Sequence, residues 1–569
     1  MKTIFISAVI VLSVIAAQAL VLNPIVDTDR SVNTFSLQTI VKDVVHDTMT
    51  PEQKLRALYI FHRRMVHHNR LKQNTEDNLT VFDPVKLYTV YGCAWCTQQS
   101  CIFRTLCAEV FGWENTMEIG SQGPVQPTRK IGGHSSFHLR FNAHDKWHWV
   151  DPPIGAFALT RTDRTIASLE DIAQDPFILI DAQKENRASV PYFPCAVPPD
   201  PIPPDLEGAY SYFAYDTGFI AGYAKGWKDG NVKQPAYFTT RKTLKKGETY
   251  YWLWDYLPGD YFNVQDREFG KTRDWQWYPP RHLCGWKDSL DTVNWSYFKP
   301  YEKEIKGVTY YRYYANGVHL FEPDFTKGDS LDDACIRSNI VSVRTTTGRM
   351  IAPVSKGKEA ELAYRIKLPY PLMSMAVSAR YVRKSAADSV VLSIARIYFD
   401  IDKAIIPKED RFVTAYADTE SAENFQDIAL LPVKTDGTFE ADLRKFVDPL
   451  ETGRTFQGYL VRFRLKSAGK AADAGLKSFR VKCIFQHNMF ALPQFEPGMN
   501  KIRVTTENGT AGFDRLKLGF GYMDNGVKKE LVRPVKKSGD GFDVTVAQKS
   551  VPKMLYMWLG NTEKSKITY

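Results

Sequence analysis

The first clear pattern along the chain is helical. Thr50, Pro51 and Gln53 have the residue types of an N-cap, a first-position proline and a capping box. Apolar residues then recur, mainly with helical spacing, as far as Met65. This pattern predicts a helix over residues 50–68.

A second helix is predicted from Cys96 to Val110. Ser100, Phe103 and other small or apolar residues fall on one face of it. Gly112 is expected to end this helix, because glycine often stands just past a helix C-terminus.

From Gly133 the pattern changes to a period of two. Apolar and polar residues alternate from residue 133 to 141 and again from 147 to 151, on either side of the polar segment 142–145. Two alternating runs around a short polar turn predict a β-hairpin. Residues 20–190 are therefore expected to form an α+β domain.

Composition divides the rest of the chain. Seven prolines fall between residues 191 and 204, which predicts a stiff linker over 191–205. Residues 206–339 are rich in tyrosine and tryptophan with weak periodicity, and they are expected to be a connecting region. Alternating strands over 340–492 predict an all-β sandwich, followed by a small all-β segment over 493–569.

The N-terminus resembles an export signal. Lys2 precedes an apolar run, and Ala17-Gln18-Ala19 follows it, which is the pattern of a signal peptide cleaved after Ala19. The run is shorter than the roughly 20 apolar residues that span a bilayer. We therefore expect residues 1–19 to be removed, no integral membrane span afterwards, and a secreted or periplasmic protein.

Charge and cysteine content exclude some classes. The net charge of +10 comes from scattered residues, which does not favour nucleic-acid binding, since that requires a basic cluster. The 569 residues include eight cysteines, too few for a disulfide scaffold. Four of them lie within residues 93–107, but their spacing matches no zinc pattern, and a redox pair would need a different context. Other cysteines remain candidates for disulfides or for the core.

Cys96 is the candidate nucleophile. At a helix N-terminus, the helix dipole lowers a thiol pKa and backbone N–H groups can stabilise an oxyanion. His134 begins the first hairpin strand and Asp151 ends the second. With a turn centred near residues 142–143, the two lie within a residue or two of direct opposition, where Cβ atoms are about 4.5–5.5 Å apart. His134 would then act as base, oriented by Asp151.

The neighbouring histidines are weaker candidates. His138 is expected to face the region of Trp147 with no carboxylate opposite. His144 falls in the turn, and His148 lies on the other face from Asp151. Among these residues, only His134 is expected to pair with a carboxylate.

Three segments together resemble the transglutaminase-like superfamily: residues 91–100 with the nucleophile, residues 133–137 with the histidine, and residues 146–152 with the aspartate. The sequence departs from the family pattern at Ser136, where an aromatic is common, and at His138, where Glu is frequent. The resemblance covers about residues 45–165.

The resemblance implies a papain-like α+β fold and thiol chemistry on amides, with Cys96, His134 and Asp151 as catalytic residues and without cofactor or metal. The expected substrate is a protein or peptide amide, and the thioacyl intermediate would pass to water or to an amine. The alternative is an inactive scaffold whose sandwiches bind envelope or extracellular polysaccharide. Five tryptophans are candidates for sugar stacking, although core packing is the commoner fate: Trp252, Trp254, Trp275, Trp277 and Trp286.

Overall fold

The computed structural model describes residues 21–68, 75–76, 79–122, 133–153, 156–175, 178, 238–254, 302–305, 308–311, 314–326, 331–346, 348–399, 420–507 and 515–561. The expected signal peptide, the Pro-rich linker and most of the region over 206–339 lie outside these residues. No helix in the described ranges combines the length and apolar character needed to cross a membrane.

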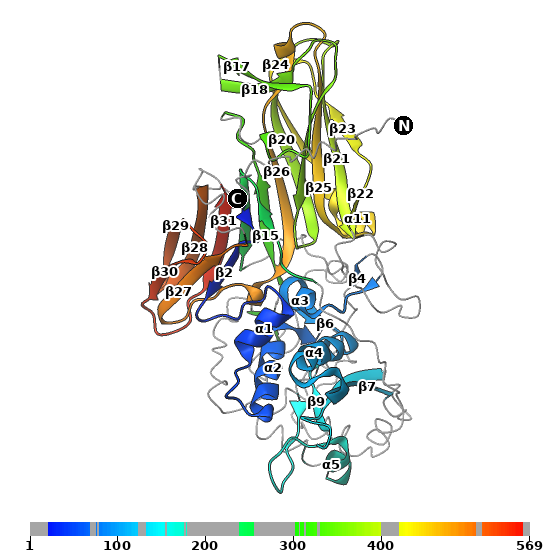
Figure 1. Ribbon diagram of the computed structural model, residues 1–569, viewed down its shortest axis with the longest axis vertical. Coiled ribbons are helices and arrows are strands. Elements are labelled where there is room, and N and C mark those ends of the chain that lie inside the picture. The colour runs from blue at the N-terminus through cyan, green and yellow to red at the C-terminus, as the bar shows by residue number, and fades with distance from the viewer. Residues whose placement is uncertain are drawn as a thin grey trace, which may run out of the picture.

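The helices gather in one part of the molecule, at the bottom of Figure 1. They are α1 (Leu37–Val44), α2 (Pro51–Met65), α3 (Pro84–Lys86), the π-helical turn η1 (Leu87–Tyr91), α4 (Cys96–Phe111), the 3-10 turn η2 (Trp113–Asn115) and α5 (Leu169–Gln174). Short helical segments elsewhere are α10 (Arg444–Val447), α11 (Pro449–Thr452), η7 (Ala471–Asp473) and η8 (Met489–Ala491).

Both predicted helices are confirmed. At the start of α2, Gln53 N–H donates to Thr50 Oγ1 (3.3 Å) and Thr50 N–H donates to Gln53 Oε1 (2.8 Å), which completes the capping box. Helix α4 ends at Gly112, where φ is +84°. A side chain there would be strained, so this position requires glycine.

A four-stranded antiparallel sheet accompanies the helices, in the order β10 (Ala156–Phe157), β9 (His148–Asp151), β8 (Gly133–Leu139) and β7 (Thr116–Gln122). Strands β8 and β9 are the predicted hairpin. Helix α4 packs on this sheet through Phe103, whose ring centroid lies 4.9 Å from that of Phe137.

The rest of the structure is mostly β. A ten-stranded sheet has the path β17 (Ile340–Thr345), β18 (Gly348–Pro353), β26 (Ala474–Asn488), β15 (Tyr314–Phe321), β12 (Glu248–Leu253), β31 (Met554–Asn561), β28 (Leu516–Asp524) and β29 (Val527–Pro534), with β20 (Leu372–Arg383) paired to β26 and β24 (Lys434–Asp442) paired to β20.

A six-stranded sheet faces part of it, formed by β16 (Ile336–Ser338), β19 (Ala360–Lys367), β25 (Phe456–Lys466), β21 (Ser389–Phe399), β22 (Glu420–Ala422) and β23 (Gln426–Leu430). Rings from the two sheets meet in the core: Phe321 lies 5.1 Å from Tyr364, and Phe463 lies 5.1 Å from Phe479. The predicted β-sandwich is therefore present, at the top of Figure 1.

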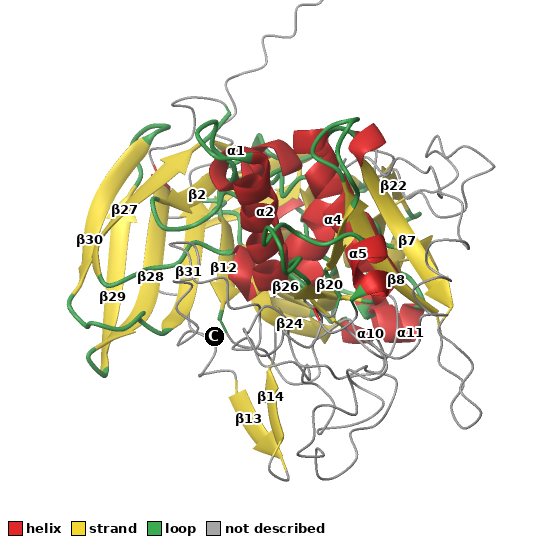
Figure 2. Ribbon diagram, turned by 90° about the horizontal axis from the view of Figure 1, so that it is seen from below, coloured by secondary structure: helices red, strands yellow, loops and turns green. Residues whose placement is uncertain are grey.

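A smaller sheet joins the two ends of the described chain: β2 (Ile25–Thr28), β27 (Gly498–Thr505) and β30 (Asp540–Val546). Two-stranded pairs are β1 (Val21–Leu22) with β11 (Thr243–Leu244), β3 (His67–His68) with β6 (Cys93–Ala94), β4 (Thr75–Glu76) with β5 (Leu79–Thr80), and β13 (Glu302–Ile305) with β14 (Val308–Tyr311). In Figure 2, helices α1, α2 and α4 appear between the β27–β30 strands and strands β7 and β8.

Strand pairing crosses the domain borders that were expected at residues 340 and 493. Strand β15 pairs with β26, and β12 pairs with β31, so residues expected to connect domains are part of the ten-stranded sheet. The alternation of β12 is hidden because both of its faces are buried: Tyr250 is on one face and Tyr251 packs against Trp558 on the other. A strand without a polar face has no period of two.

Candidate functional site

Cys96 is the first residue of α4, as predicted. The chain reaches it through Gly92 in a left-handed conformation (φ +64°) and the short strand β6, which pairs in parallel with β3. Cys96 is a buried thiol, with 5% of its surface exposed. This places its sulfur at the positive end of a 16-residue helix.

Buried glutamines fix the start of α4. Gln98 Nε2 donates to the carbonyl of Val81 (2.6 Å), and Gln99 Nε2 donates to the carbonyl of Ala94 (2.8 Å). Both side chains are fully buried. Because Ala94 lies two residues before Cys96, these bonds hold the backbone of the candidate nucleophile against the neighbouring segments.

Two aromatic contacts set the alignment of α4 with β8. Phe111 lies 5.9 Å from Phe141, and Phe103 lies 4.9 Å from Phe137, so helix and strand run in the same direction. From Phe103 back to Cys96 the helix rises about 10 Å, at about 1.5 Å per residue. From Phe137 back to residue 134 the strand covers about the same distance, at about 3.3 Å per residue. With these average rises, the backbones of Cys96 and His134 are expected at about the same level of the helix–sheet interface.

The hairpin register differs slightly from the expected one. Phe137 pairs with Val150 and Leu139 with His148, and continuing this register puts Asp151 opposite Ser136. The turn spans residues 142–145, closed by a bond from Asp145 N–H to the carbonyl of Asn142 (3.1 Å), so its centre lies one residue later than predicted.

His134 and Asp151 are therefore related diagonally, which is within the residue or two of direct opposition that was expected. The backbone of His134 lies two residues from the position facing Asp151, and diagonal neighbours on a sheet are about 7–8 Å apart, within reach of long side chains. The side chains of His134 and Cys93 lie outside the described part of the structure. The pairing of His134 with Asp151 stays a prediction.

Asp151 is fully buried at the end of β9. The turn that follows it is held by Arg63 of α2, which is 1% exposed. Arg63 Nη1 donates to the carbonyls of Pro152 (2.6 Å) and Pro153 (3.0 Å). The sequence analysis did not identify this residue, although a basic residue inside the apolar stripe of the predicted helix was a signal for it.

His138 behaves as predicted and lies against Trp147, with ring centroids 6.2 Å apart and nearly parallel planes. Burial, together with the nearby His148, lowers the pKa of His138 to about 3. It is therefore neutral at physiological pH. On the same sheet face, Trp149 Nε1 donates to Ser136 Oγ (3.2 Å), so the two departures from the family pattern both occupy packed positions.

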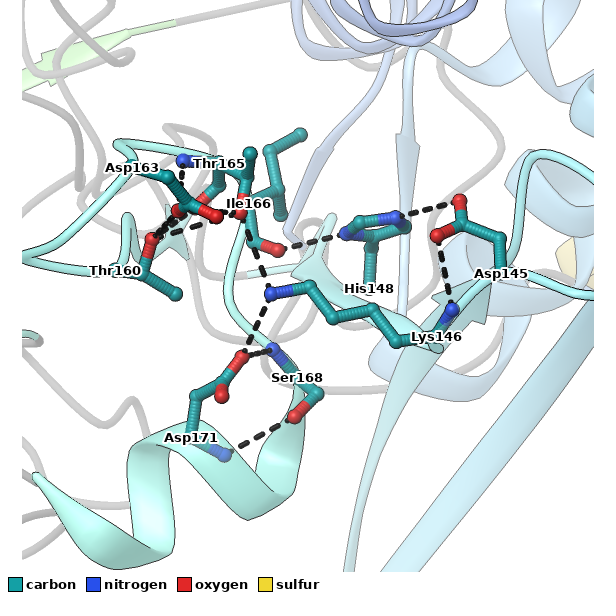
Figure 3. A network of polar contacts seen from close by, with 9 residues as sticks. All are labelled: Asp145, Lys146, His148, Thr160, Asp163, Thr165, Ile166, Ser168 and Asp171. Carbon is teal, nitrogen blue, oxygen red and sulfur yellow. Dashed lines mark hydrogen bonds and ion pairs between the residues drawn. The ribbon is translucent and has the colours of Figure 1, made fainter.

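The expectation that only His134 pairs with a carboxylate is wrong. His148 Nε2 lies 3.1 Å from Asp145 Oδ2, and its Nδ1 donates to the carbonyl of Ile166 (2.7 Å), as Figure 3 shows. This network continues through Lys146 Nζ, which lies 3.0 Å from Asp171 Oδ2. The network joins the hairpin turn to α5 and to the segment before α5. The turn is at the opposite end of strand β8 from His134, so we assign the network a structural role.

The cysteines further along α4 are of a different kind. Cys101 Sγ donates to Glu118 Oε2 of β7 (3.0 Å), and burial with the Glu118 charge raises the pKa of Cys101 well above its ordinary value. Burial likewise raises the pKa of Cys107. In the described residues, no three His, Cys, Asp or Glu side chains are grouped to hold a metal ion.

Of the tryptophans considered for sugar stacking, Trp252 and Trp254 are both core residues with 2% exposure. Trp275, Trp277 and Trp286 lie outside the described residues. The described tryptophans of this set thus have no face available to a sugar.

Comparisons with known proteins identify no family for this chain. No family model matches the chain, and no curated protein matches it. Solved structures with partial resemblance include a xylan-binding module (14% identity, TM-score 0.16, covering 29% of this chain and 95% of the module). A xanthan lyase from Paenibacillus resembles 40% of this chain over 25% of its own length (7% identity, TM-score 0.15). A protein from Parabacteroides distasonis described as secreted resembles 46% of this chain over 83% of its own (11% identity, TM-score 0.15). At these TM-scores the resemblances carry no argument about function.

Proposed function

We propose that the chain is an exported cysteine hydrolase of the transglutaminase-like type, a peptidase or amidase with a papain-like helix–sheet unit. The observation that supports it best is the packing of α4 on β8 through Phe103 and Phe137, from which we expect the backbones of Cys96 and His134 at about one level. Asp151, on the next strand, is buried in a turn fixed by Arg63.

In the proposed reaction, the Cys96 thiolate attacks the carbonyl carbon of an amide, and the carbonyl oxygen becomes an oxyanion. The first turn of α4 directs backbone N–H groups and the positive end of its dipole toward this end of the helix, which favours both anions. His134 then protonates the departing amine, leaving an acyl group on the sulfur.

In the second half, His134 takes a proton from water as the water oxygen attacks the thioester. Cleavage of the carbon–sulfur bond releases a carboxylic acid and restores the thiol. Where an amine attacks instead, the product is a new amide. Asp151 orients the imidazole and stabilises its charged form. The proposed substrate is a protein or peptide amide; sandwich binding to polysaccharide is a separate, untested prediction.

Thiol labelling tests the nucleophile within one helix. Wild-type protein is treated with iodoacetamide from pH 5.5 to 9, and modification of Cys96, Cys101 and Cys107 is followed by mass spectrometry of peptides. Cys96 is expected to react well below pH 8, whereas burial and Glu118 keep Cys101 protonated and burial does the same for Cys107. Equal resistance of all three thiols contradicts the proposal and favours the inactive scaffold.

Variants then test the roles of the other two residues. His134→Ala should move the Cys96 labelling profile to higher pH, because the thiolate loses a cationic partner. Asp151→Asn should weaken amide turnover less than Cys96→Ala does, since it misorients the base without removing it. His138→Gln is the matched control, because its ring packs on Trp147 outside the proposed triad. A larger effect of His138→Gln than of His134→Ala contradicts the assignment.

A further inference from the structure

A cavity of about 50 Å³ lies where the helical part meets the ten-stranded sheet, and Cys96 is not among the described residues that line it. Its walls come from segments far apart in the sequence: the loop 31–35 before α1, the stretch from Thr240 to Trp252, and residues 491–493. Figure 2 shows β2, β12 and β31, each of which contributes residues to the cavity wall. One water needs about 10–15 Å³, so the cavity has room for several water-sized groups.

Lys242 is the charged residue of this wall. It is 9% exposed, and its Nζ lies over the ring of Trp252, 5.5 Å from the centroid. The ring is held in place because Trp252 Nε1 donates to the Tyr370 hydroxyl (3.3 Å). Within the described part of the chain, Lys242 Nζ has neither a hydrogen bond nor an ion pair.

The remaining wall is polar but contains no carboxylate among its described residues. Hydroxyl groups come from Ser31 and Thr240, and an amide comes from Asn33. Burial lowers the pKa of Lys242 to about 8, so the ammonium form still prevails at neutral pH. The charge is thus buried with an aromatic face as its compensation, and such a contact stabilises a cation by less than burying the charge costs.

We propose that this cavity binds a small monovalent oxyanion of the carboxylate class, with Lys242 Nζ as its cationic contact and the Thr240 hydroxyl as a further donor. An anion supplies the negative charge that the wall lacks, and the ring of Trp252 closes the opposite side of the ammonium. A molecule of acetate size fits the volume, whereas a sugar does not. The site is independent of the chemistry proposed for Cys96.

The first test titrates acetate at constant pH and ionic strength, with the sodium salt of a bulky sulfonate as the balancing salt. The melting temperature of the wild type should rise and saturate. Lys242→Met should abolish this response. Arg241→Met is the matched control, because the neighbouring guanidinium pairs with Glu507 on the surface and is 62% exposed. An equal acetate response in Lys242→Met, or none in the wild type, overturns the proposal.

A second test uses the wild type alone and does not depend on the folding of a variant. Reductive methylation with formaldehyde is followed lysine by lysine with peptide mass spectrometry, with and without acetate at pH 8. Acetate should slow methylation of Lys242 selectively, about fivefold if its pKa rises by one unit from about 8. An unchanged rate at Lys242, or equal slowing at all lysines, contradicts a site at this position.

Discussion

Arg63, in the helical region around α2, and Lys242, at the junction with the ten-stranded sheet, are both buried basic side chains. Arg63 donates two bonds from one nitrogen to the carbonyls of Pro152 and Pro153. Lys242 has an aromatic face, hydroxyl groups and an open cavity. Arg63 thus holds the turn behind Asp151 through Nη1, although its Nε and Nη2 have no hydrogen-bond partner among the described residues, and the Lys242 ammonium borders a cavity.

The difference follows from the chemistry of the two head groups and their surroundings. A planar guanidinium can bond adjacent carbonyls in fixed directions, and at Arg63 this fixes the turn behind Asp151. An ammonium is a compact point charge that needs a counter-charge or water. Stability measurements should therefore show Arg63 as strongly stabilising and Lys242 as a residue whose charge costs stability.

The largest effect is expected for Arg63→Met. This change leaves the carbonyls of Pro152 and Pro153 buried without their donor, at a cost of about 1–3 kcal/mol for each carbonyl in the free energy of unfolding. Urea denaturation measures it. Arg56→Met is the control on the same helix: Arg56 pairs with Glu52 at 2.7 Å in an i,i+4 arrangement near the surface, and its loss should cost about 1 kcal/mol or less. Equal costs for both variants contradict the role assigned to Arg63.

The next effect concerns Lys242 and has the opposite sign. Its pKa is lowered to about 8 in the folded protein from an ordinary 10.5, because of burial. The unfolded state therefore binds more protons between about pH 8 and 10.5, and stability should rise with pH across this window, by up to about 3 kcal/mol. Below pH 8 both states are protonated and the full penalty applies.

Lys242→Met should remove this rise and stabilise the protein at pH 7. Tyr370, the other titratable group of the cavity wall, has its pKa raised by burial to about 12 and does not titrate in the window. The measurement is a series of urea denaturations from pH 7 to 10.5 on the wild type and the variant. A parallel pH dependence in the two proteins contradicts the assignment.

Regions of the molecule also differ in how much of their structure could be predicted from the sequence. Helices α2 and α4 and the β8–β9 hairpin have local signals: the capping box at Thr50, the glycine at residue 112 and the alternation after Gly133. These elements are confirmed. The turn centre was missed by one residue because Asp145 accepts the N–H of Phe141 (3.3 Å), which extends the turn on its far side.

The long-range features had no local signal. Arg63 bonds residues about ninety positions away, and its partners are carbonyls, which every residue carries. Strand β12 is buried on both faces, so its pattern of Tyr250, Tyr251 and Trp252 lacks the polar alternation that marks a strand. The Lys242 cavity is lined by six separate parts of the chain, all of which must be in place before it exists.

A moderate effect is expected at the hairpin turn. Asp145 is surrounded by donors: although burial acts to raise its pKa, the hydrogen bonds from His148 and from the Phe141 and Lys146 N–H groups lower it below 3.8. Its carboxylate therefore stabilises the fold above its unfolded pKa, and this stabilisation is lost as pH falls through the folded pKa. Asp145→Asn should cost about 1 kcal/mol at pH 7, and urea denaturation should show this cost shrinking as the pH falls through the folded pKa of Asp145.

The smallest effect is expected for Thr50→Ala, which removes the cap of α2 and little else. The Thr50 hydroxyl accepts the N–H of Gln53 at the exposed helix start, and losing such a cap costs about 0.5–1 kcal/mol. Arg63 lies on the same helix three turns further along. If tertiary contacts hold α2 more strongly than its local signals do, Thr50→Ala should cost several-fold less than Arg63→Met in the same urea series. The loss in free energy of unfolding of the double variant should equal the sum of the losses of the two single variants, because the two sites share no partner. A cap cost equal to that of Arg63 would instead show that α2 is stabilised locally, and that the turn behind Asp151 depends little on the guanidinium.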